Sequence, residues 1–269
     1  MLKVVILGTG RMGRQIAKRL SEEKDLKIVA AICAPNDPDL GKDIGLLSGT
    51  GPLGIAVESS ENLSKILDKE KPEVVVDFTI ADACFKNFKT VAEKRIDMII
   101  GTTGLSEQQM NEIKKEIEKN KIGIVISPNM SIGVNVYLKL VEEATKMLKD
   151  YDIEIIEVHH RFKKDSPSGT AIKTASVIAK SLGKNLRDIA VYGREGTAPR
   201  KESEIGIHSI RAGDIIGEHT VLYSNIGERI EITHRAHSRD AFVNGVIKSI
   251  RFIHGKKGIY GIDDVMGIK

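Results

Sequence analysis

The segment from Glu157 to Ala171 contains the residues of this chain that are best suited to chemistry. Two histidines, His159 and His160, are followed by Lys163 and then by a Ser-Pro-Ser-Gly-Thr turn. Histidine changes its protonation state near neutral pH, and lysine carries a positive charge. Each of these residues alone is more often part of an ordinary surface turn. Together they suit one task, which is to bind a dicarboxylate and to protonate it.

The elements on either side of this segment are predicted to be a strand and a helix. Residues 153–156 form an apolar, β-branched run that is typical of a strand. Residues 172–182 carry apolar side chains at helical spacing. Ser168 or Thr170 can cap this helix, which leaves backbone N–H groups free to face an anion. We therefore expect a proton donor, cations and an anion-binding turn at one strand-to-helix corner.

Zinc binding is the alternative interpretation of the adjacent histidines. Imidazole is a common zinc ligand, but a zinc site needs further ligands at suitable spacing. No cysteine or third histidine with such spacing lies near His159 and His160 in the sequence. We therefore expect no metal.

A glycine-rich turn lies near the N-terminus. Residues 3–7 predict a buried strand, and residues 14–23 predict an amphipathic helix. Between them the chain reads Gly8-Thr9-Gly10-Arg11-Met12-Gly13. This G-x-G-x-x-G pattern between a strand and a helix is typical of Rossmann-like dinucleotide binding, because the glycines let the backbone approach a pyrophosphate. The alternative is a tight turn that binds no ligand.

The end of the second predicted strand, residues 27–32, bears on the choice of dinucleotide. The usual fingerprint has an acidic residue there, which binds the adenosine ribose. In this chain Asp37 and Asp39 come only further on, so the 2′-phosphate of NADPH is not repelled. Arg11 and Lys42 are the candidates to contact that phosphate. We expect the chain to use both NADH and NADPH.

Strands and helices continue to alternate up to residue 126. A long loop is predicted for residues 35–54. The strands that follow are predicted at residues 73–79, 98–100 and 122–126, and the helices at residues 63–70, 81–94 and 107–120. This alternation predicts a parallel sheet, whose ligands lie beyond the carboxyl ends of the strands. Three polar turns, at residues 77–79, 101–104 and 127–130, fall at that edge, although each could simply end its strand.

The second half of the chain has a different pattern. After a helix at residues 136–149, the sequence predicts strands at residues 153–158, 189–192, 205–211, 218–224 and 229–234, with one clear helix among them. This pattern favours an open mixed or antiparallel sheet covered on one face. The polar stretches 211–214 and 234–239 are most simply a turn and a charged strand end, although Arg235 or Arg239 could contribute positive potential near a substrate. A last helix is predicted at residues 242–253.

Composition sets broad limits on the class of protein. The 269 residues are 41% hydrophobic and 29% charged, with a formal net charge of +4, as in an ordinary globular protein. Aromatic residues make up only 4%, and tryptophan is absent, which argues against nucleic-acid binding by base stacking. Cys33 and Cys84 are not in a CxxC pattern and are expected to be free thiols in the cytoplasm. No apolar run is long enough to predict a membrane span.

The segment 159–171 reads His-His-x-x-Lys-x-Asp-x-Pro-Ser-Gly-Thr-Ala. It closely resembles the signature of the 4-hydroxy-tetrahydrodipicolinate reductases, also called dihydrodipicolinate reductases, of lysine and diaminopimelate biosynthesis. The resemblance implies an NAD(P)H-dependent reduction of a small cyclic dicarboxylate and assembly as a homotetramer. The alternatives are a related two-domain dehydrogenase, such as an aspartate or sugar-acid dehydrogenase, and a nucleotide-sensing protein without turnover.

The resemblance also implies roles for individual residues. It places a dinucleotide-binding domain at residues 1–130 with 241–269, and a substrate-binding and oligomerisation domain at residues 131–240. His159 and Lys163 would be general acids, and the substrate carboxylate would be held by His160, Ser168, Gly169 and Thr170. The cofactor would be bound by the following residues: Gly8, Thr9, Gly10, Arg11, Met12, Gly13, Gly101, Thr102, Thr103, Ser127, Pro128, Asn129 and Met130.

Overall fold

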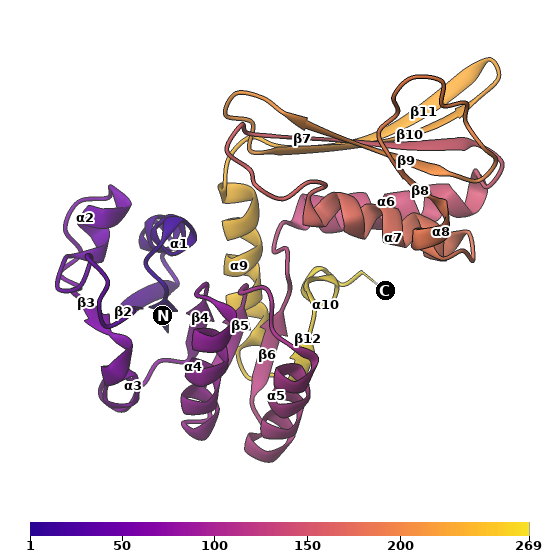
Figure 1. Cartoon of the computed structure of the whole chain (residues 1–269). Coiled ribbons are helices and arrows are strands. Elements are labelled where there is room, and N and C mark those ends of the chain that lie inside the picture. Colours follow the sequence, from indigo (N-terminus) through magenta and orange to yellow (C-terminus); the bar gives the residue numbers. More distant parts are fainter. Residues whose placement is uncertain (269) are drawn as a thin grey trace. The chain divides into compact units, whose positions relative to one another are not determined.

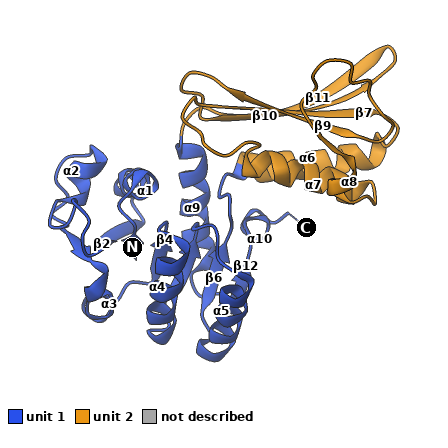
Figure 2. Cartoon of the chain, viewed as in Figure 1, with its two compact units in different colours: residues 1–132, 239–269 blue, residues 133–238 orange. Residues whose placement is uncertain are grey.

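The computed structural model describes residues 1–268 of the chain. Two compact units are present among the described residues, one formed by residues 1–132 with 239–268 and the other by residues 133–238 (Figure 2). The predicted domain boundaries, 130/131 and 240/241, differ from these by two residues. The chain leaves the first unit once and returns to it, so its two segments are far apart in sequence.

The first unit is built on a seven-stranded sheet in which all described pairs are parallel (Figure 1). The strand order is β12-β6-β5-β4-β1-β2-β3. The strands are β1 (Leu2–Leu7), β2 (Leu26–Cys33), β3 (Val57–Ser59), β4 (Val74–Asp77), β5 (Asp97–Ile100), β6 (Gly123–Ile126) and β12 (Gly258–Tyr260). The prediction of a Rossmann-like parallel sheet is confirmed.

Helices cover both faces of this sheet because successive strand residues point to opposite sides. In β1, Val4 and Ile6 pack on one side, and Val5 and Leu7 pack on the other. The first side is covered by α1 (Arg11–Ser21), α2 (Ile44–Ser48), α9 (Asp240–Ile253) and α10 (Ile262–Met266). The second side is covered by α3 (Leu63–Glu70), which follows the 3-10 turn η1 (Ser60–Asn62), and by α4 (Ala81–Glu93) and α5 (Glu107–Asn120).

The second unit contains a mixed five-stranded sheet with helices on one face (Figure 1). The order is β11-β10-β7-β9-β8, antiparallel on the β10 side of β7 and parallel on the β9 side. The strands are β7 (Asp152–His159), β8 (Ala190–Tyr192), β9 (Ile205–Arg211), β10 (Gly217–Asn225) and β11 (Glu228–Ala236). The helices are α6 (Ile132–Met147), α7 (Gly169–Ser181) and α8 (Leu186–Ile189). The predicted open mixed sheet is confirmed.

The main departure from the predicted elements is α2, which lies inside the stretch that the sequence indicated as a long loop. Asp43 explains the difference. Its carboxylate caps α2 by accepting the N–H groups of Gly45 and Leu46, and it also accepts those of Leu53, Gly54 and Ile55. One aspartate therefore holds a glycine-rich stretch together, a long-range effect that local composition does not reveal.

Candidate functional site

The glycine-rich turn joins β1 to α1 and is packed too closely for larger residues. Gly8 has a φ of +93°, and a Cβ added to it would lie 2.6 Å from the carbonyl oxygen of Phe78. A Cβ on Gly13 would lie 1.7 Å from the carbonyl oxygen of Gly8. These two glycines are therefore required by the backbone itself.

Gly10 has a different environment, which fits a pyrophosphate. It is the N-cap of α1, and apart from its chain neighbours no described atom lies within 4 Å of an added Cβ. The hydroxyl of the buried residue Thr9 also has no hydrogen-bond partner among the described residues. Open space beside the start of a helix, with backbone donors and an unsatisfied hydroxyl, suits an anionic group. The exposed residue Arg11 and the half-buried residue Met12 begin the helix.

The turns after β4 and β5 are linked to this glycine-rich turn. The buried carboxylate of Asp77 accepts hydrogen bonds from the backbone N–H of Thr79 at 2.9 Å and from the hydroxyl of Thr102 at 2.8 Å. A Cβ on Gly101 would lie 2.1 Å from the ring of Phe78, the same residue whose carbonyl contacts Gly8. The structure therefore brings Gly8, Gly101 and Thr102 together. Thr103, next along the chain, is exposed.

The turn after β6 is held by its own hydrogen bonds. The Ser127 hydroxyl donates to the carbonyl of Asn129 at 2.8 Å, and the side chain of Asn129 accepts the N–H of Ser131 at 2.9 Å. The backbone N–H of Ser127 donates to Ile100 at the end of β5. Met130 is buried, whereas Pro128 is exposed. The predicted cofactor residues thus lie at the carboxyl ends of neighbouring strands, where ligands of such sheets bind.

Two aspartates fold back to the end of β2. Burial raises the pKa of the Cys33 thiol, and the nearby charges of Asp37 and Asp39 raise it further. The Asp39 carboxylate pairs with Arg14 and, at 3.3 Å, with Lys42. Burial opposes its ionisation, but the hydrogen bonds from these two cations outweigh that effect and lower the pKa of Asp39. Arg14 also donates to the carbonyl of Thr9, which places this cluster beside the glycine-rich turn.

The second unit brings together the residues of the segment 157–171. Glu157 and His159 are two positions apart on β7 and therefore face the same side of the sheet. Glu157 is completely buried. Its carboxylate accepts two bonds from Arg211, at 2.8 and 3.0 Å, the backbone N–H of Ser168 at 3.1 Å, and a 2.5 Å bond from Nδ1 of His159.

The ionisation of this pair follows from its contacts. Burial alone would raise the pKa of Glu157, but the hydrogen bonds led by Arg211 outweigh it and lower that pKa to about 2. Burial lowers the pKa of His159, and Glu157 opposes that change without cancelling it. The charge of Lys163 also lowers the pKa of His159, so the two predicted acids lie within electrostatic reach of each other. Near neutral pH the pair is a carboxylate beside a mainly neutral imidazole.

Ser168 is the N-cap of α7, and its hydroxyl accepts the N–H of Ala171 at 3.2 Å. Of the two caps that the sequence allowed, Ser168 is the one formed. Its hydroxyl also bonds Nε2 of His219, from β10, at 3.0 Å. The rings of His219 and His159 are 5.2 Å apart. Burial, followed by the nearby charge of His159, lowers the pKa of His219 to about 3, so His219 is a neutral neighbour.

The remaining predicted residues lie on the turn between β7 and α7. The ammonium of Lys163 is 2.8 Å from the carboxylate of Asp165, and its backbone N–H donates to the carbonyl of His160. Nδ1 of His160 is buried and has no hydrogen-bond partner among the described residues. Gly169, the first residue of α7, is exposed, and Thr170 is half-buried.

Three residues of this cluster received no role in the sequence analysis. Glu157 was within the segment, and its position on the buried side of an otherwise apolar strand was a usable signal, because a buried carboxylate needs partners. Arg211 ends β9, and the interpretation of 211–214 as a plain turn does not account for its bonds to Glu157. His219 comes from a distant strand, and no local pattern in the sequence indicates it.

Glu157, His159 and His219 also bring ligand-type atoms within 4.8 Å of one another. The sequence argument against zinc counted only residues close in the sequence, and the structure brings a third histidine, His219, from a distant strand. A different argument now applies: Glu157 already accepts four hydrogen bonds, and its charge is balanced by Arg211. A divalent cation would compete with that guanidinium for the same oxygens. We therefore assign a hydrogen-bonding role, and not metal binding, to this cluster.

Glu157 is expected to make stability depend on pH. Its pKa is about 2 in the folded chain, against an ordinary value of 4.5, so its stabilisation is fully present above pH 4.5. As the pH falls from there towards 2 the stabilisation is lost, by about 2 kcal/mol at pH 3. Urea unfolding at pH 7 and pH 3 should show that the free energy of unfolding falls less on acidification for Glu157→Gln than for the unaltered chain. Equal losses would contradict this assignment.

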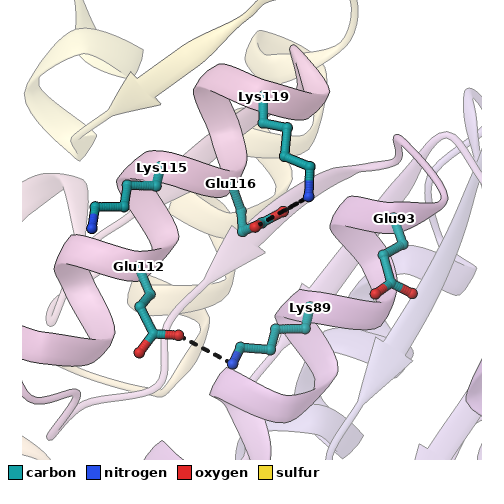
Figure 3. Close-up of a pocket in the computed structure, with 6 residues that line it drawn as sticks. All are labelled: Lys89, Glu93, Glu112, Lys115, Glu116 and Lys119. Atoms are coloured by element: carbon teal, nitrogen blue, oxygen red, sulfur yellow. Dashed lines mark hydrogen bonds and ion pairs between the residues drawn. The ribbon is translucent and has the colours of Figure 1, made fainter.

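A separate hollow of about 200 Å³ lies on the first unit and is lined by α4 and α5 (Figure 3). It is lined by charged side chains of both signs: Lys89, Glu93, Glu112, Lys115, Glu116 and Lys119. Lys89 pairs with Glu112 at 3.1 Å, and Lys119 pairs with Glu116 at 3.4 Å. These pairs are exposed, and such pairs are common on helix surfaces. The hollow has the character of a solvated helix surface, and the chemistry lies elsewhere.

The fold and the two sets of residues define a class. A parallel sheet with a glycine-rich turn, and a second unit with a buried acid–base cluster at a helix start, are the parts of a two-unit nicotinamide-dependent oxidoreductase. Family models agree in detail: "Dihydrodipicolinate reductase, N-terminus" matches residues 2–130, and "Dihydrodipicolinate reductase, C-terminus" matches residues 133–266. The chain belongs to the dihydrodipicolinate reductase family.

Individual relatives support the same assignment. A 4-hydroxy-tetrahydrodipicolinate reductase of Methanocaldococcus jannaschii is 50% identical, over 100% of this chain and 98% of the relative. One from Methanothermobacter thermautotrophicus is 47% identical over the full length of both. Among solved structures, a dipicolinate-bound dihydrodipicolinate reductase from Paenisporosarcina sp. TG-14 has a TM-score of 0.79 and 27% identity, over 98% of this chain and 99% of that one.

More distant structures share only the architecture. An amine dehydrogenase from Mycobacterium smegmatis has a TM-score of 0.62 at 14% identity, over 97% of this chain and 95% of that one. Similarity at this level shows the fold alone. None of the helices in residues 1–268 is both long enough and apolar enough to span a membrane.

Proposed function

We propose that this chain catalyses the NAD(P)H-dependent reduction of 4-hydroxy-tetrahydrodipicolinate to tetrahydrodipicolinate, a step of lysine and diaminopimelate biosynthesis. The observation that carries the proposal is the cluster of His159, Lys163 and Ser168 at the start of α7, within a chain whose relatives carry this name over their whole length. The sheet and the glycine-rich turn alone would fit other two-unit dehydrogenases, so the proposal depends on this cluster.

The substrate carries two carboxylates, which need cations and N–H donors when they leave water. We assign this task to His160 and to the start of α7, where the backbone N–H groups of Gly169 and Thr170 follow the cap Ser168. The helix dipole adds to the attraction. Lys163 contributes a positive charge on the adjoining turn.

The proton comes from this chain's own side chains. The reaction adds a hydride and a proton to the substrate, and the hydroxyl group of the hydrated form leaves as water. A reduced nicotinamide, when bound, supplies the hydride. We assign the proton to Lys163 and His159, acting as general acids. Since the lowered pKa of His159 leaves it mainly neutral near pH 7, Lys163 is the donor that is charged in the resting site.

The cofactor residues of the proposal are those around the glycine-rich turn. Gly8, Gly10 and Gly13, with Thr9, Arg11 and Met12, would hold the pyrophosphate. The turns after β5 and β6 would hold the nicotinamide half through the following residues: Gly101, Thr102, Thr103, Ser127, Pro128, Asn129 and Met130. The open space at Gly10 supports the first assignment, and the location of the turns at the carboxyl edge of the sheet supports the second.

A direct assay tests the activity. Purified protein is mixed with freshly prepared substrate and either NADH or NADPH, and the loss of nicotinamide absorbance is followed. We expect turnover with both cofactors and inhibition by pyridine-2,6-dicarboxylate, whose two carboxylates match those of the substrate. No turnover with either cofactor would refute the proposal and would favour a nucleotide-sensing role or a different dehydrogenase substrate.

Use of both cofactors is part of the proposal, and Asp39 is the residue that sets the balance. It neutralises Arg14 and Lys42 beside the glycine-rich turn, so these cations are only partly available to a 2′-phosphate. Asp39→Asn frees them. We expect the ratio of kcat/KM for NADPH to that for NADH to rise about fivefold, as fits roughly 1 kcal/mol from partly exposed charges.

Asp37→Asn is the matched control for this change. It removes one negative charge at the same end of β2, but Asp37 accepts the backbone N–H of Asp39, and among the described residues it forms no ion pair with Arg14 or Lys42. In Asp37→Asn the ratio of kcat/KM for NADPH to that for NADH should stay within about twofold of the original value, since a charge outside an ion pair is screened by salt. Equal shifts in both variants would show that only general charge matters, and no shift in Asp39→Asn would reject its role.

The oligomer and the cellular compartment complete the proposal. The sheet of the second unit has helices on one face only, and on the other face lie partly exposed apolar residues, including Ile156, Ile210 and Leu222. We propose that this open face forms the contacts of a homotetramer, and light scattering should give four times the chain mass of 29.5 kDa. Cys33 and Cys84 are buried free thiols, which suits a cytoplasmic enzyme.

A further inference from the structure

We infer that Glu157, held in place by Arg211, is the positioning residue for both halves of the substrate site: it orients the acid His159 and it fixes the start of α7 that receives the carboxylate. This inference rests on the proposed function, and it adds to it two residues to which the sequence and the comparisons assign no role. Its basis is one buried carboxylate with four donors from three separate elements, namely β7, β9 and the start of α7.

The bond to His159 selects one tautomer of the imidazole. An ionised carboxylate can only accept hydrogen bonds, so Nδ1 of His159 must carry the hydrogen in its 2.5 Å contact with Glu157. The other nitrogen, Nε2, is then the one that gains and loses a proton. Gly217 lies beside that nitrogen, because a Cβ added to Gly217 would come within 3.0 Å of Nε2. The missing side chain at Gly217 leaves room there.

The second bond couples the acid to the anion-binding turn. The other oxygen of Glu157 accepts the backbone N–H of Ser168 at 3.1 Å, and Ser168 is the cap of α7. A carboxylate at this place would by itself repel a dicarboxylate. Arg211 removes that difficulty, because its guanidinium bonds both oxygens of Glu157 and balances their charge. Glu157 can therefore fix the helix start without competing with the substrate.

Arg211 extends the same support to the turn that carries Lys163. Besides its bonds to Glu157, it donates to the carbonyl of Asp165 at 2.7 Å. Asp165 in turn pairs with Lys163 at 2.8 Å. One arginine at the end of β9 thus links the strand of His159, the turn of Lys163 and, through Glu157, the cap of α7. Positioning of this kind is what keeps reacting groups within a few tenths of an ångström.

The variant Glu157→Gln tests the inference because it has nearly the same shape. An amide accepts hydrogen bonds only at its oxygen, so its NH2 group must face either the backbone N–H of Ser168 or Nδ1 of His159, and on either side one bond from Arg211 is lost. The backbone group cannot change, whereas the imidazole can move its hydrogen to Nε2. We therefore expect His159 to adopt the opposite tautomer in this variant.

The first measurement is the tautomer itself, by ¹⁵N NMR of histidine-labelled protein. The signals of His159 are identified among the seven histidines as those missing from His159→Asn. In the unaltered chain, Nδ1 should be protonated and Nε2 should not. A protonated Nε2 in the neutral ring of the unaltered chain would overturn the inference. This readout needs no reductase activity, so it stands even if the proposed function fails.

The second measurement is kinetic. Because Glu157→Gln can keep the bond to Ser168, the KM for the substrate should stay within about threefold, whereas kcat should fall about 10- to 30-fold because the nitrogen that gains and loses a proton is then Nδ1 instead of Nε2. A fall in kcat with no change of tautomer, or a change of tautomer at full kcat, would each contradict the inference. A thermal midpoint measured on the same samples identifies loss of folded protein.

Glu154→Gln is the matched control. Glu154 lies on the same strand, on the opposite face of the sheet, and its carboxylate is 2.7 Å from Nε2 of His208. The substitution therefore removes a comparable carboxylate–imidazole pair outside the proposed substrate site, and light scattering on the same sample checks that the proposed tetramer face is undisturbed. We expect an unchanged His159 tautomer and a kcat within about twofold of the original. If this control lowered kcat as strongly as Glu157→Gln, the effect would be one of general sheet disruption.

Discussion

Replacing Lys163 with alanine is expected to lower kcat about 100- to 1000-fold, the range of a lost general acid. We assign proton donation to Lys163, since burial lowers the pKa of His159 and leaves that ring mainly neutral near neutral pH. The side chain of Lys163 is 20% exposed and is oriented by its 2.8 Å pair with Asp165. Because we assign binding of the nicotinamide cofactor to the other unit, the KM for NADH and NADPH should change by less than about threefold.

Lys164→Ala is the natural control for this substitution. The neighbouring lysine is exposed and has the same charge, so its removal tests whether charge alone explains the effect. We expect kcat within about twofold of the original for Lys164→Ala. Steady-state rates at saturating substrate decide the question. Normal turnover of Lys163→Ala would reject its role as the acid, and equal losses in both variants would point to general attraction of the dicarboxylate.

The parts of the site that could be predicted from sequence are those built by contiguous residues. The strand β7, the turn with His160 and Lys163, and the capped start of α7 follow one another along the chain. The same is true of β1, the glycine-rich turn and α1. In both cases local patterns, namely strand alternation, helical spacing and glycine position, are sufficient because they describe the same local geometry that the fold uses.

The parts that could not be predicted depend on contacts between distant segments. Arg211 lies 54 positions after Glu157, and His219 lies 51 positions after Ser168. Both arrive through the pairing of β9 and β10 with β7, and strand register is not readable from a single strand. The zinc argument was incomplete for the same reason, because it counted histidines along the sequence and the sheet brings His219 from a distant strand.

The position of Asp39 near the end of β2 is another feature that could not be predicted from the sequence. The sequence lacks the acidic residue that usually ends this strand, and it predicts only a long loop in its place. In the structure the loop turns back at Asp37, whose side chain accepts the N–H of Asp39, and Asp43 holds the next segment. The carboxylate of Asp39 therefore lies near the end of β2, where the usual fingerprint has an acidic residue. It is already paired with Arg14 and Lys42.

Replacing Gly10 with valine is expected to weaken both nicotinamide cofactors about 100-fold or more while leaving the fold intact. The two other glycines of the turn cannot give so clear a test. Gly8 has a φ of +93°, and a Cβ on Gly13 would lie 1.7 Å from a carbonyl oxygen, so substitutions there would damage the turn itself. Gly10 has a φ of −69°, and no described atom lies within 4 Å of an added Cβ. A side chain at this position therefore fits the folded chain but fills the space that we assign to the pyrophosphate.

The size of the effect follows from the bonds that would be lost. Hydrogen bonds between backbone N–H groups and a charged phosphate contribute about 1.5–3 kcal/mol each, and 1.4 kcal/mol is a factor of ten in affinity. Losing two of them therefore gives about 100-fold or more. Gly261→Val is the control, because Gly261 is also a helix N-cap, that of α10, with an ordinary φ of −95° and no close contact for an added Cβ. Fluorescence titration with NADH and NADPH, together with thermal midpoints, separates the two cases. Unchanged cofactor affinity in a folded Gly10→Val protein would show that the pyrophosphate does not bind at this turn. Equal losses of cofactor affinity in Gly10→Val and Gly261→Val would show that the effect is not specific to the glycine-rich turn.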